Sequence, residues 1–263
     1  MKTDIPSYQI CHRNIDAPIF SGKREVDWFF FDSNLNCNLH CLYCHNERDL
    51  KLVSEEQFTN FLETKIKSIN HFSLGCAMEP TMDKRMTKFA LLLKNSGKKP
   101  NGVFRLQTNG ILLDRHNLDE LKESEMNTIN FSIDTIDSEV HKKQRGGSDI
   151  GKILANVIKV RKEWKEVSIQ FVTTITSQSA PTVEDLIKFS IDNGVNEMVL
   201  RKMFYHVGSR VIQNHEQMKE MLMTSEEFDL LCAPLIQKYK EKIKFFYNGE
   251  VEMDKVTKSI IRN

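Results

Sequence analysis

The chain alternates between strand-like and helix-like segments, and this alternation constrains its fold more than any other feature. The strand-like runs are 26–31, 71–74, 102–107, 128–133, 167–174 and 197–203. Between them lie apolar stripes with helical spacing, of which the first two are Phe58, Phe61, Leu62, Ile66 and Ile69, and Met82, Met86, Phe89, Ala90 and Leu93. Serial β–α units favour a parallel sheet covered by helices. The sequence therefore predicts an α/β fold, either an open doubly wound sheet or a barrel.

Local signals predict where individual elements begin and end. Capping-box patterns begin at Ser54 and at Thr224, so each predicts a helix start. Pro234 falls inside the helix that follows Thr224, where it predicts a kink or an early end. Residues 243–247 and 250–253 flank an Asn-Gly pair, which predicts a small hairpin.

A loop with three cysteines follows the first strand-like run. Cys37, Cys41 and Cys44 have the spacing C-x3-C-x2-C. Closely spaced thiolates select zinc, copper(I) or iron–sulfur clusters. The loop has no obvious fourth ligand, which favours a cluster with one iron left open to another molecule. A zinc site with His40 or His45 as the fourth ligand is the alternative.

Composition excludes several classes of function. The net charge is +1 with both signs interspersed, so the chain has no electrostatic footprint for nucleic acid or an anionic membrane. No apolar run approaches the roughly 18 residues that a membrane span needs. Six cysteines without a secretory signal indicate reduced thiols rather than disulfides. We therefore expect a cytoplasmic protein that binds neither nucleic acid nor membrane.

Polar residues gather where the predicted strands end. They are residues 32–44 after the first strand, 76–79 after the second, 107–109 after the third, and Ser132 and Asp134 at the fourth. In a barrel, functional groups come from the carboxyl ends of the strands. This pattern favours a site at one mouth of a barrel-like sheet.

Taken in order, these motifs resemble those of the radical S-adenosylmethionine (radical SAM) enzymes. The resemblance rests on the cysteine loop, on residues 75–80 as a variant glycine–glycine–glutamate–proline turn, on residues 107–110, and on residues 131–147. The last two segments are similar to those of the molybdenum-cofactor cyclase and peptide-modifying groups. The resemblance implies a partial (β/α)6 TIM-like barrel over 26–203, preceded by an extension (1–25) and followed by a C-terminal helix and extension packed on the core (204–263).

The resemblance also implies the cofactors. Cys37, Cys41 and Cys44 hold a 4Fe–4S cluster, and S-adenosylmethionine occupies the fourth iron. One-electron reduction then cleaves S-adenosylmethionine to methionine and a 5′-deoxyadenosyl radical, which abstracts hydrogen from a substrate. The protein binds and orients the reactants and excludes competing reactions.

Roles for further residues follow by motif position. Tyr43 is expected to pack near the adenine and Glu79 to accept a charge-assisted hydrogen bond from the methionyl ammonium. Ser132 and Asp134 are candidates for the ribose hydroxyls. Arg201, at the end of the sixth strand, is a candidate for pairing with a carboxylate of the cofactor or the substrate.

Other positions line the site or depart from the family pattern. Asn109 is a candidate polar lining residue. Cys76 stands in the variant turn, where it is a candidate hydrogen-atom donor or acid/base group, with burial as the plainer alternative. Only Cys232 follows the predicted barrel, so we expect no auxiliary cluster, which argues against the cyclase itself.

The resemblance leaves the substrate open between a small metabolite and a peptide. A flavodoxin- or ferredoxin-like protein is the expected electron donor. One alternative function is a glycyl-radical-enzyme activase, because residues 41–46 look like the cluster loop of such activases. Another is a non-catalytic iron–sulfur or zinc-binding module, which would need the cysteine loop alone.

Overall fold

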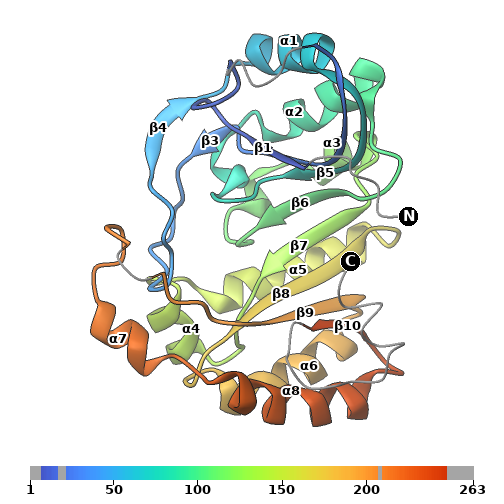
Figure 1. Cartoon of the computed structure of the whole chain (residues 1–263). Coiled ribbons are helices and arrows are strands. Elements are labelled where there is room, and N and C mark those ends of the chain that lie inside the picture. Colours follow the sequence, from blue (N-terminus) through green and yellow to red (C-terminus); the bar gives the residue numbers. More distant parts are fainter. Residues whose placement is uncertain (1–6, 17–21, 207–208, 248–263) are drawn as a thin grey trace. The chain divides into compact units, whose positions relative to one another are not determined.

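The computed structural model describes residues 7–16, 22–206 and 209–247 (Figure 1). The chain forms two compact units that each draw on several segments. The first comprises Met1–Asn38, Asn46–Asn130 and Lys162–Val167, and the second comprises Leu39–His45, Phe131–Arg161 and Ser168–Asn263.

Parallel strands and helices build the first unit. Its strands are β1 (Tyr8–Ile10), β2 (Arg24–Phe31), β3 (Asn34–Leu35), β4 (Asp49–Leu52), β5 (Ile66–Leu74) and β6 (Phe104–Thr108). Its helices are α1 (Glu55–Lys65), α2 (Met86–Leu93) and α3 (Leu118–Glu123), with 3₁₀ turns at Pro80–Met82 and Leu113–Arg115 and a π-helical turn at Lys94–Lys98. Parallel pairing gives the order β1-β2-β5-β6, and β3 pairs with β4 in antiparallel orientation.

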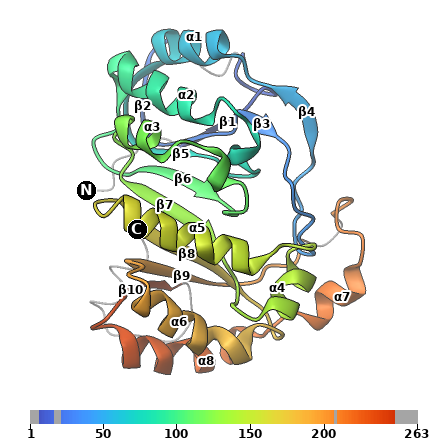
Figure 2. The ribbon, with the colours of Figure 1, turned by 180° about the vertical axis from the view of Figure 1, so that it is seen from behind.

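An aromatic core joins this sheet to its helices. Phe29 and Phe31 are two residues apart on β2, so their side chains lie on the same face of the strand, and both are fully buried. Phe31 contacts Phe58 of α1, with ring centroids 4.2 Å apart, and Phe89 of α2, at 5.2 Å. Each fully buried side chain of this size contributes roughly 2–3 kcal/mol. This packing holds α1 and α2 on the sheet. Figure 2 shows the two helices beside the strands of this unit.

The second unit repeats the same kind of construction. Strand β7 (Thr128–Ser132) enters it at Phe131. Its other strands are β8 (Ser168–Ile175), β9 (Glu197–Lys202) and β10 (Lys244–Tyr247), which pair in parallel in that order. Its helices are α4 (Ser138–Gln144), α5 (Ile150–Glu163), α6 (Val183–Asp192), α7 (His215–Glu220) and α8 (Ser225–Tyr239), with a 3₁₀ turn at Ala180–Thr182.

The predicted α/β fold class is confirmed. All six predicted strand-like runs coincide with strands, namely β2 and β5 to β9. Both capping boxes form: the Ser54 side chain accepts from the N–H of Gln57, and Thr224 accepts from Glu227. The parallel strand β1 was not predicted, because a run of three residues carries too little pattern.

Several local predictions are wrong. Ile66 and Ile69 belong to β5 rather than to the preceding helix, since α1 ends at Lys65. Helix α8 continues through Pro234 to Tyr239, so the proline does not shorten it. Met82 was placed in the second apolar stripe with helical spacing, but it ends a 3₁₀ turn before α2 begins and is 36% exposed.

The predicted hairpin is also corrected. Its first half is β10, which pairs in parallel with β9 rather than in an antiparallel hairpin. Its second half, 250–253, lies outside the described residues.

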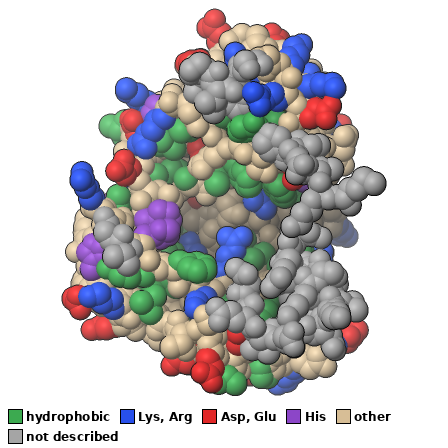
Figure 3. Space-filling model, in the orientation of Figure 1, with side chains coloured by type: hydrophobic (Ala, Val, Ile, Leu, Met, Phe, Trp, Pro, Cys, Tyr) green, Lys and Arg blue, Asp and Glu red, His purple; other side chains and the backbone are tan. Residues whose placement is uncertain are grey.

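The surface carries both signs of charge. Figure 3 shows Lys and Arg side chains interspersed with Asp and Glu on the visible face, in keeping with the net charge of +1. Among the described residues, the helices are all too short or too polar to span a bilayer.

Candidate functional site

Cys37 lies near the start of the loop that follows β3 and belongs to the first unit. Its half-buried side chain packs against a small cluster formed by Cys11, Leu35 and Met78. The Cys37 carbonyl accepts a hydrogen bond from Arg48 at 2.8 Å. The side-chain amide nitrogen of Asn109, directly after β6, lies 3.9 Å from the Cys37 sulfur. Hydrogen bonds of this kind to cysteine sulfur tune metal thiolates.

Glu79 follows β5 and its carboxylate is buried, with 2% of the residue exposed. Its Oε1 accepts from the N–H of Thr81 at 3.1 Å, from the Thr81 hydroxyl at 2.5 Å and from the Thr108 hydroxyl at 2.6 Å. Its Oε2 accepts from the N–H of Asn109 at 2.6 Å. Burial raises the pKa of Glu79, and these hydrogen bonds act in the opposite direction. The carboxylate thus joins the turn after β5 to the end of β6.

A second buried carboxylate supports the same turn. Asp32, at the end of β2, accepts from the N–H of Cys76 at 2.9 Å and from the N–H of Ala77 at 3.3 Å. Its other oxygen accepts from the Gln9 side chain of β1 at 2.9 Å. Burial raises the pKa of Asp32, although its hydrogen bonds oppose that rise. The Asp32 carboxylate therefore holds the backbone of the variant turn at residues 76 and 77. The Cys76 side chain is exposed.

The other two cysteines of the loop belong to the second unit and sit at the two ends of one tight turn. The Cys44 N–H donates to the Cys41 carbonyl at 3.0 Å, which closes the turn. Both cysteines are half-buried. Leu42 and Tyr43 form the centre of the turn, and the Leu42 N–H donates to the Gln144 carbonyl at 2.9 Å.

Tyr43 belongs to a buried polar network. Its hydroxyl donates to Asp134, which is fully buried just after β7. Arg145 donates two hydrogen bonds to the same carboxylate, of 2.8 and 2.7 Å. Burial raises the pKa of Tyr43 well above its usual value, and the Arg145 cation opposes this. Burial lowers the pKa of Arg145, but attraction by Asp134, with further contributions from Tyr43 and Cys41, outweighs it and raises that pKa.

The remaining predicted residues in the second unit are less enclosed. Ser132, the last residue of β7, is half-buried, and Arg201 on β9 is exposed. The structure therefore gives two groupings, Cys37 with Glu79 and Asn109, and Tyr43 with Asp134. No three His, Cys, Asp or Glu side chains of the described residues are grouped to hold a single metal ion.

Two histidines of the second unit stack face to face. His45, next to Cys44, lies with its ring centroid 3.5 Å from that of His206. Partial burial and the neighbouring His206 lower the pKa of His45. A neutral imidazole is favoured there, because two stacked cations would repel each other.

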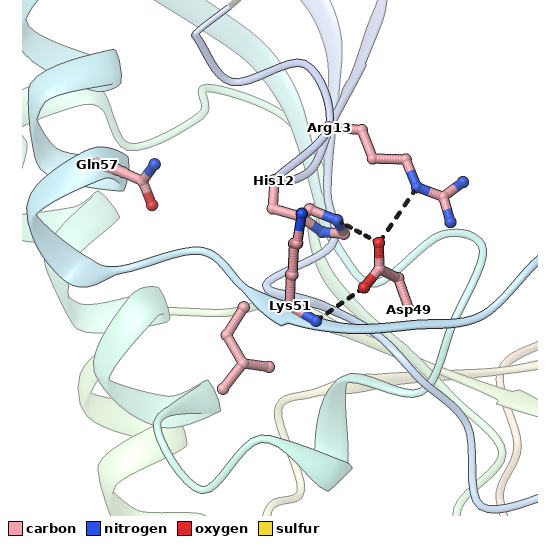
Figure 4. A pocket seen from close by; sticks show the side chains of 6 residues that line it. His12, Arg13, Asp49, Lys51 and Gln57 are labelled. Carbon is pink, nitrogen blue, oxygen red and sulfur yellow. Dashed lines mark hydrogen bonds and ion pairs between the residues drawn. The ribbon is translucent and has the colours of Figure 1, made fainter.

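A pocket of about 590 Å³ opens elsewhere in the first unit. Its lining includes none of the residues predicted for the site and consists of His12, Arg13, Asp49, Lys51, Leu52 and Gln57. Among these lining residues, Asp49 pairs with His12 at 2.9 Å (Figure 4).

Sequence reasoning missed the residues that hold the site residues in place. Thr81 and Thr108 donate hydrogen bonds to the Glu79 carboxylate. Gln144 holds the turn between Cys41 and Cys44 through Leu42, and Arg145 holds Asp134, the partner of Tyr43. Thr108 and Arg145 stand inside the motifs already recognised, so their positions gave a signal. Their partners could not be read from the sequence, because the contacts join segments 29 and 11 residues apart.

Comparisons with known proteins bear on the same region. The family model described as the Radical SAM superfamily matches residues 34–190. A curated relative from Methanococcus aeolicus, named "Probable GTP 3′,8-cyclase", is 27% identical over 179 residues, which covers 66% of this chain and 58% of the relative. The chain spans about half the length of the curated relatives it matches.

Solved structures share the fold. Streptococcus suis SuiB bound to S-adenosylmethionine matches with a TM-score of 0.66 at 16% identity, covering 84% of this chain and 50% of SuiB. The structure of anSMEcpe with bound AdoMet and a peptide matches with a TM-score of 0.65 at 18% identity, covering 84% of this chain and 64% of that protein. These likenesses support the predicted fold class.

Proposed function

Since the chain belongs to the radical SAM superfamily, we propose that it cleaves S-adenosylmethionine reductively at a single 4Fe–4S cluster and takes hydrogen from a small metabolite or a peptide. Radical SAM enzymes use this cluster and this cofactor. The observation that carries the proposal is the three-cysteine loop inside the matched region, with two of its thiols at the ends of one closed turn.

The donor set fits such a cluster. Cys37, Cys41 and Cys44 would hold three irons through soft thiolates, which leaves one iron for S-adenosylmethionine. The Asn109 amide beside the Cys37 sulfur suits a thiolate that carries negative charge. When bound and reduced, the cluster supplies the electron that cleaves the sulfonium to methionine and a 5′-deoxyadenosyl radical.

We assign Glu79 to the methionyl ammonium. An ionised carboxylate offers about four lone-pair sites on its two oxygens. Three donors converge on Oε1, whereas Oε2 accepts from the Asn109 N–H. Oε2 therefore keeps capacity for a cation, and a buried charge-assisted hydrogen bond is stronger than a neutral one. Thr81 and Thr108 hold the carboxylate in one orientation, and Asn109 lines the same place.

The adenosine would be held by residues of the second unit. Tyr43 offers an aromatic face for the adenine, and its hydroxyl is fixed by Asp134. Asp134 already accepts from Tyr43, from Thr174 and twice from Arg145. Four donors occupy its lone pairs, so Ser132 is the better candidate for the ribose hydroxyls. We assign Arg201 to a carboxylate of the cofactor or the substrate.

Cys76 is our candidate for the hydrogen-atom donor. Its side chain is exposed in a turn that Asp32 holds firmly, so a thiol is presented without being buried in the core. A thiol can transfer a hydrogen atom to a substrate radical, as an epimerisation requires. The S–H bond then breaks, and the thiyl radical that remains is returned to the thiol by one electron from the external donor and one proton. Solvent deuterium should then enter the product and be lost in Cys76→Ala, and unchanged incorporation in that variant would exclude the role.

Only the names of the relatives indicate a substrate class. One is named "Probable GTP 3′,8-cyclase", and SuiB has been seen bound to a precursor peptide. We propose a flavodoxin- or ferredoxin-like donor, because each cleavage consumes an electron from outside the protein. The cluster thiols must stay reduced, which places the enzyme in a reducing compartment such as the cytoplasm.

Anaerobic reconstitution tests the proposal. We expect about four irons and four sulfides per chain. With S-adenosylmethionine and a low-potential reductant, the reconstituted protein should release 5′-deoxyadenosine and methionine in equal amounts. A cluster that forms but releases neither product would contradict the proposal, as would a protein that takes up zinc in place of iron.

A further inference from the structure

The turn that carries Cys41 and Cys44 is held at both of its central residues. The Leu42 N–H donates to the Gln144 carbonyl at 2.9 Å, and the Tyr43 hydroxyl donates to Asp134. The turn itself closes through Cys44 and Cys41. A short loop of this kind is mobile by default, so two anchors on its central residues need an explanation.

Asp134 accepts the second of these anchors, from Tyr43, and connects it to other parts of the unit. It is fully buried, and its two oxygens accept from four donors on three other segments. Arg145 supplies two of them in the bidentate geometry that gives the strongest orientation. The N–H of Thr174, on β8, supplies a third at 2.9 Å, and the Tyr43 hydroxyl supplies the fourth. The ion pair thus ties the cysteine turn to a rigid strand.

The end of α4 packs against the same loop by backbone contact. Gly146 has a φ of +58°, and a Cβ at this position would lie 2.4 Å from the carbonyl oxygen of His40 and 2.8 Å from its nitrogen. A side chain is excluded there by backbone atoms that cannot move aside. Gln144 and Gly146 therefore contact the loop by a hydrogen bond and a close backbone approach, and Arg145 between them pairs with the Asp134 carboxylate that also holds Tyr43.

We propose that Asp134 and Arg145 are positioning residues that hold Cys41 and Cys44 ready for the cluster before it binds, and that their paired charges set the electrostatic environment of the bound cluster. The second part rests on the proposed function, while the first concerns the loop alone. Neither residue touches the reacting atoms in this role.

The charge argument predicts opposite effects for the two residues. Together they are neutral, and the Arg145 cation interacts with the charge of Cys41. Replacing Asp134 by Asn leaves an uncompensated cation that acts on Cys41, which favours the reduced, more negative cluster. Replacing Arg145 by Gln leaves an uncompensated carboxylate, which favours the oxidised cluster. Net charge near a cluster is one of the main determinants of its potential.

Hydrogen exchange of the Leu42 amide tests the first part in the metal-free protein. We expect Asp134→Asn and Arg145→Gln to exchange this amide at least tenfold faster than the wild type. Tyr43→Phe, which removes one donor and keeps the ring, should give a smaller acceleration in the same direction. Equal exchange in all four proteins would overturn the proposal.

The chain offers a matched control for these variants. Asp83 is also buried and also receives two hydrogen bonds from an arginine, Arg85, but it lies in the first unit. Asp83→Asn should leave Leu42 exchange unchanged. If it accelerated Leu42 exchange as much as Asp134→Asn does, the effect would be general destabilisation and the positioning role would be wrong.

A redox titration of the reconstituted proteins, followed by electron paramagnetic resonance, tests the second part. The midpoint potential should rise in Asp134→Asn, fall in Arg145→Gln and stay constant in Asp83→Asn. Shifts of the same sign in both Asp134→Asn and Arg145→Gln would contradict the charge argument. If the wild type failed to assemble a cluster, the proposed function would fail, while the exchange result would still decide the positioning of the loop.

Discussion

Glu79 shows how much of a site residue's role lies in its neighbours. The motif of residues 75–80 predicted its importance, and the structure adds four donors around its carboxylate. All four groups act as hydrogen-bond donors to Glu79, so both side-chain oxygens of this residue must be acceptors. A neutral amide of the same shape cannot meet this requirement, because its nitrogen is a donor.

We therefore expect Glu79→Gln to be costly. The amide nitrogen would face a buried donor, and the free energy of unfolding should fall by about 2–3 kcal/mol. Binding of S-adenosylmethionine should weaken at least tenfold, since the charge that meets its ammonium is lost. Urea unfolding and calorimetry measure the two effects. Glu123→Gln, on an exposed side chain, is the control, and comparable losses in it would contradict this account.

His141 makes the stability of the second unit depend on pH. It is fully buried on α4, and burial, with the nearby Arg145 cation, lowers its pKa to about 4. Asp134 and Asp149 act in the opposite direction. In the unfolded chain its pKa returns to about 6.5. The unfolded state therefore binds more protons between these values, so stability falls as the pH drops from 6.5 towards 4.

The expected loss from this residue is on the order of 3 kcal/mol at pH 4, and it is absent at pH 7. Denaturant unfolding at pH 7.5, 6 and 5 measures it. His141→Gln should have a flatter pH dependence than the wild type over this range. A variant that loses stability with falling pH as steeply as the wild type would show that His141 is not the group responsible.

At the scale of elements, two neighbouring glycines separate steric exclusion from backbone strain. Gly146 and Gly147 both have positive φ, +58° and +86°. A Cβ on Gly146 would meet the backbone of His40, whereas a Cβ on Gly147 would have no atom within 4 Å. Only the first position therefore couples the end of α4 to the cysteine loop.

Alanine substitutions should separate the two effects. Gly147→Ala should cost about 1 kcal/mol, because alanine is strained at positive φ. Gly146→Ala should cost at least about 3 kcal/mol and should also expose the Leu42 amide to exchange, since the loop must move away. Thermal unfolding and hydrogen exchange check both. Equal effects of the two substitutions would mean that α4 does not support the loop.

The sequence predicted elements well wherever a local pattern was strong. The capping boxes at Ser54 and Thr224 fix the starts of α1 and α8 as expected. The boundary between α1 and β5 was missed, because Ile66 and Ile69 continue the apolar spacing of the helix into the strand. Strand β10 was read as half of a hairpin, since its parallel partner β9 lies more than 40 residues earlier.

At the scale of the whole molecule, the serial β–α units determined the fold class and the motif order indicated the superfamily. Both follow from patterns that repeat or keep their order along the chain. The burial of Asp134 and its pairing with Arg145 could not be predicted, because a polar residue after a strand can equally well be solvated, cap a turn or bind a ligand. Tertiary contacts decide among these, and sequence spacing does not show them.

The central claim is that one loop holds the cluster at which S-adenosylmethionine is cleaved. The most direct test is the yield of 5′-deoxyadenosine after anaerobic reconstitution, in the presence and absence of reductant. We compare the wild type with the alanine variants of Cys37, Cys41 and Cys44, and with Cys232→Ala, whose thiol is buried in α8. Reductant-dependent product should form in the wild type and in Cys232→Ala, and fall below detection in each loop variant. Cleavage that persists in any of the three loop variants would contradict the account.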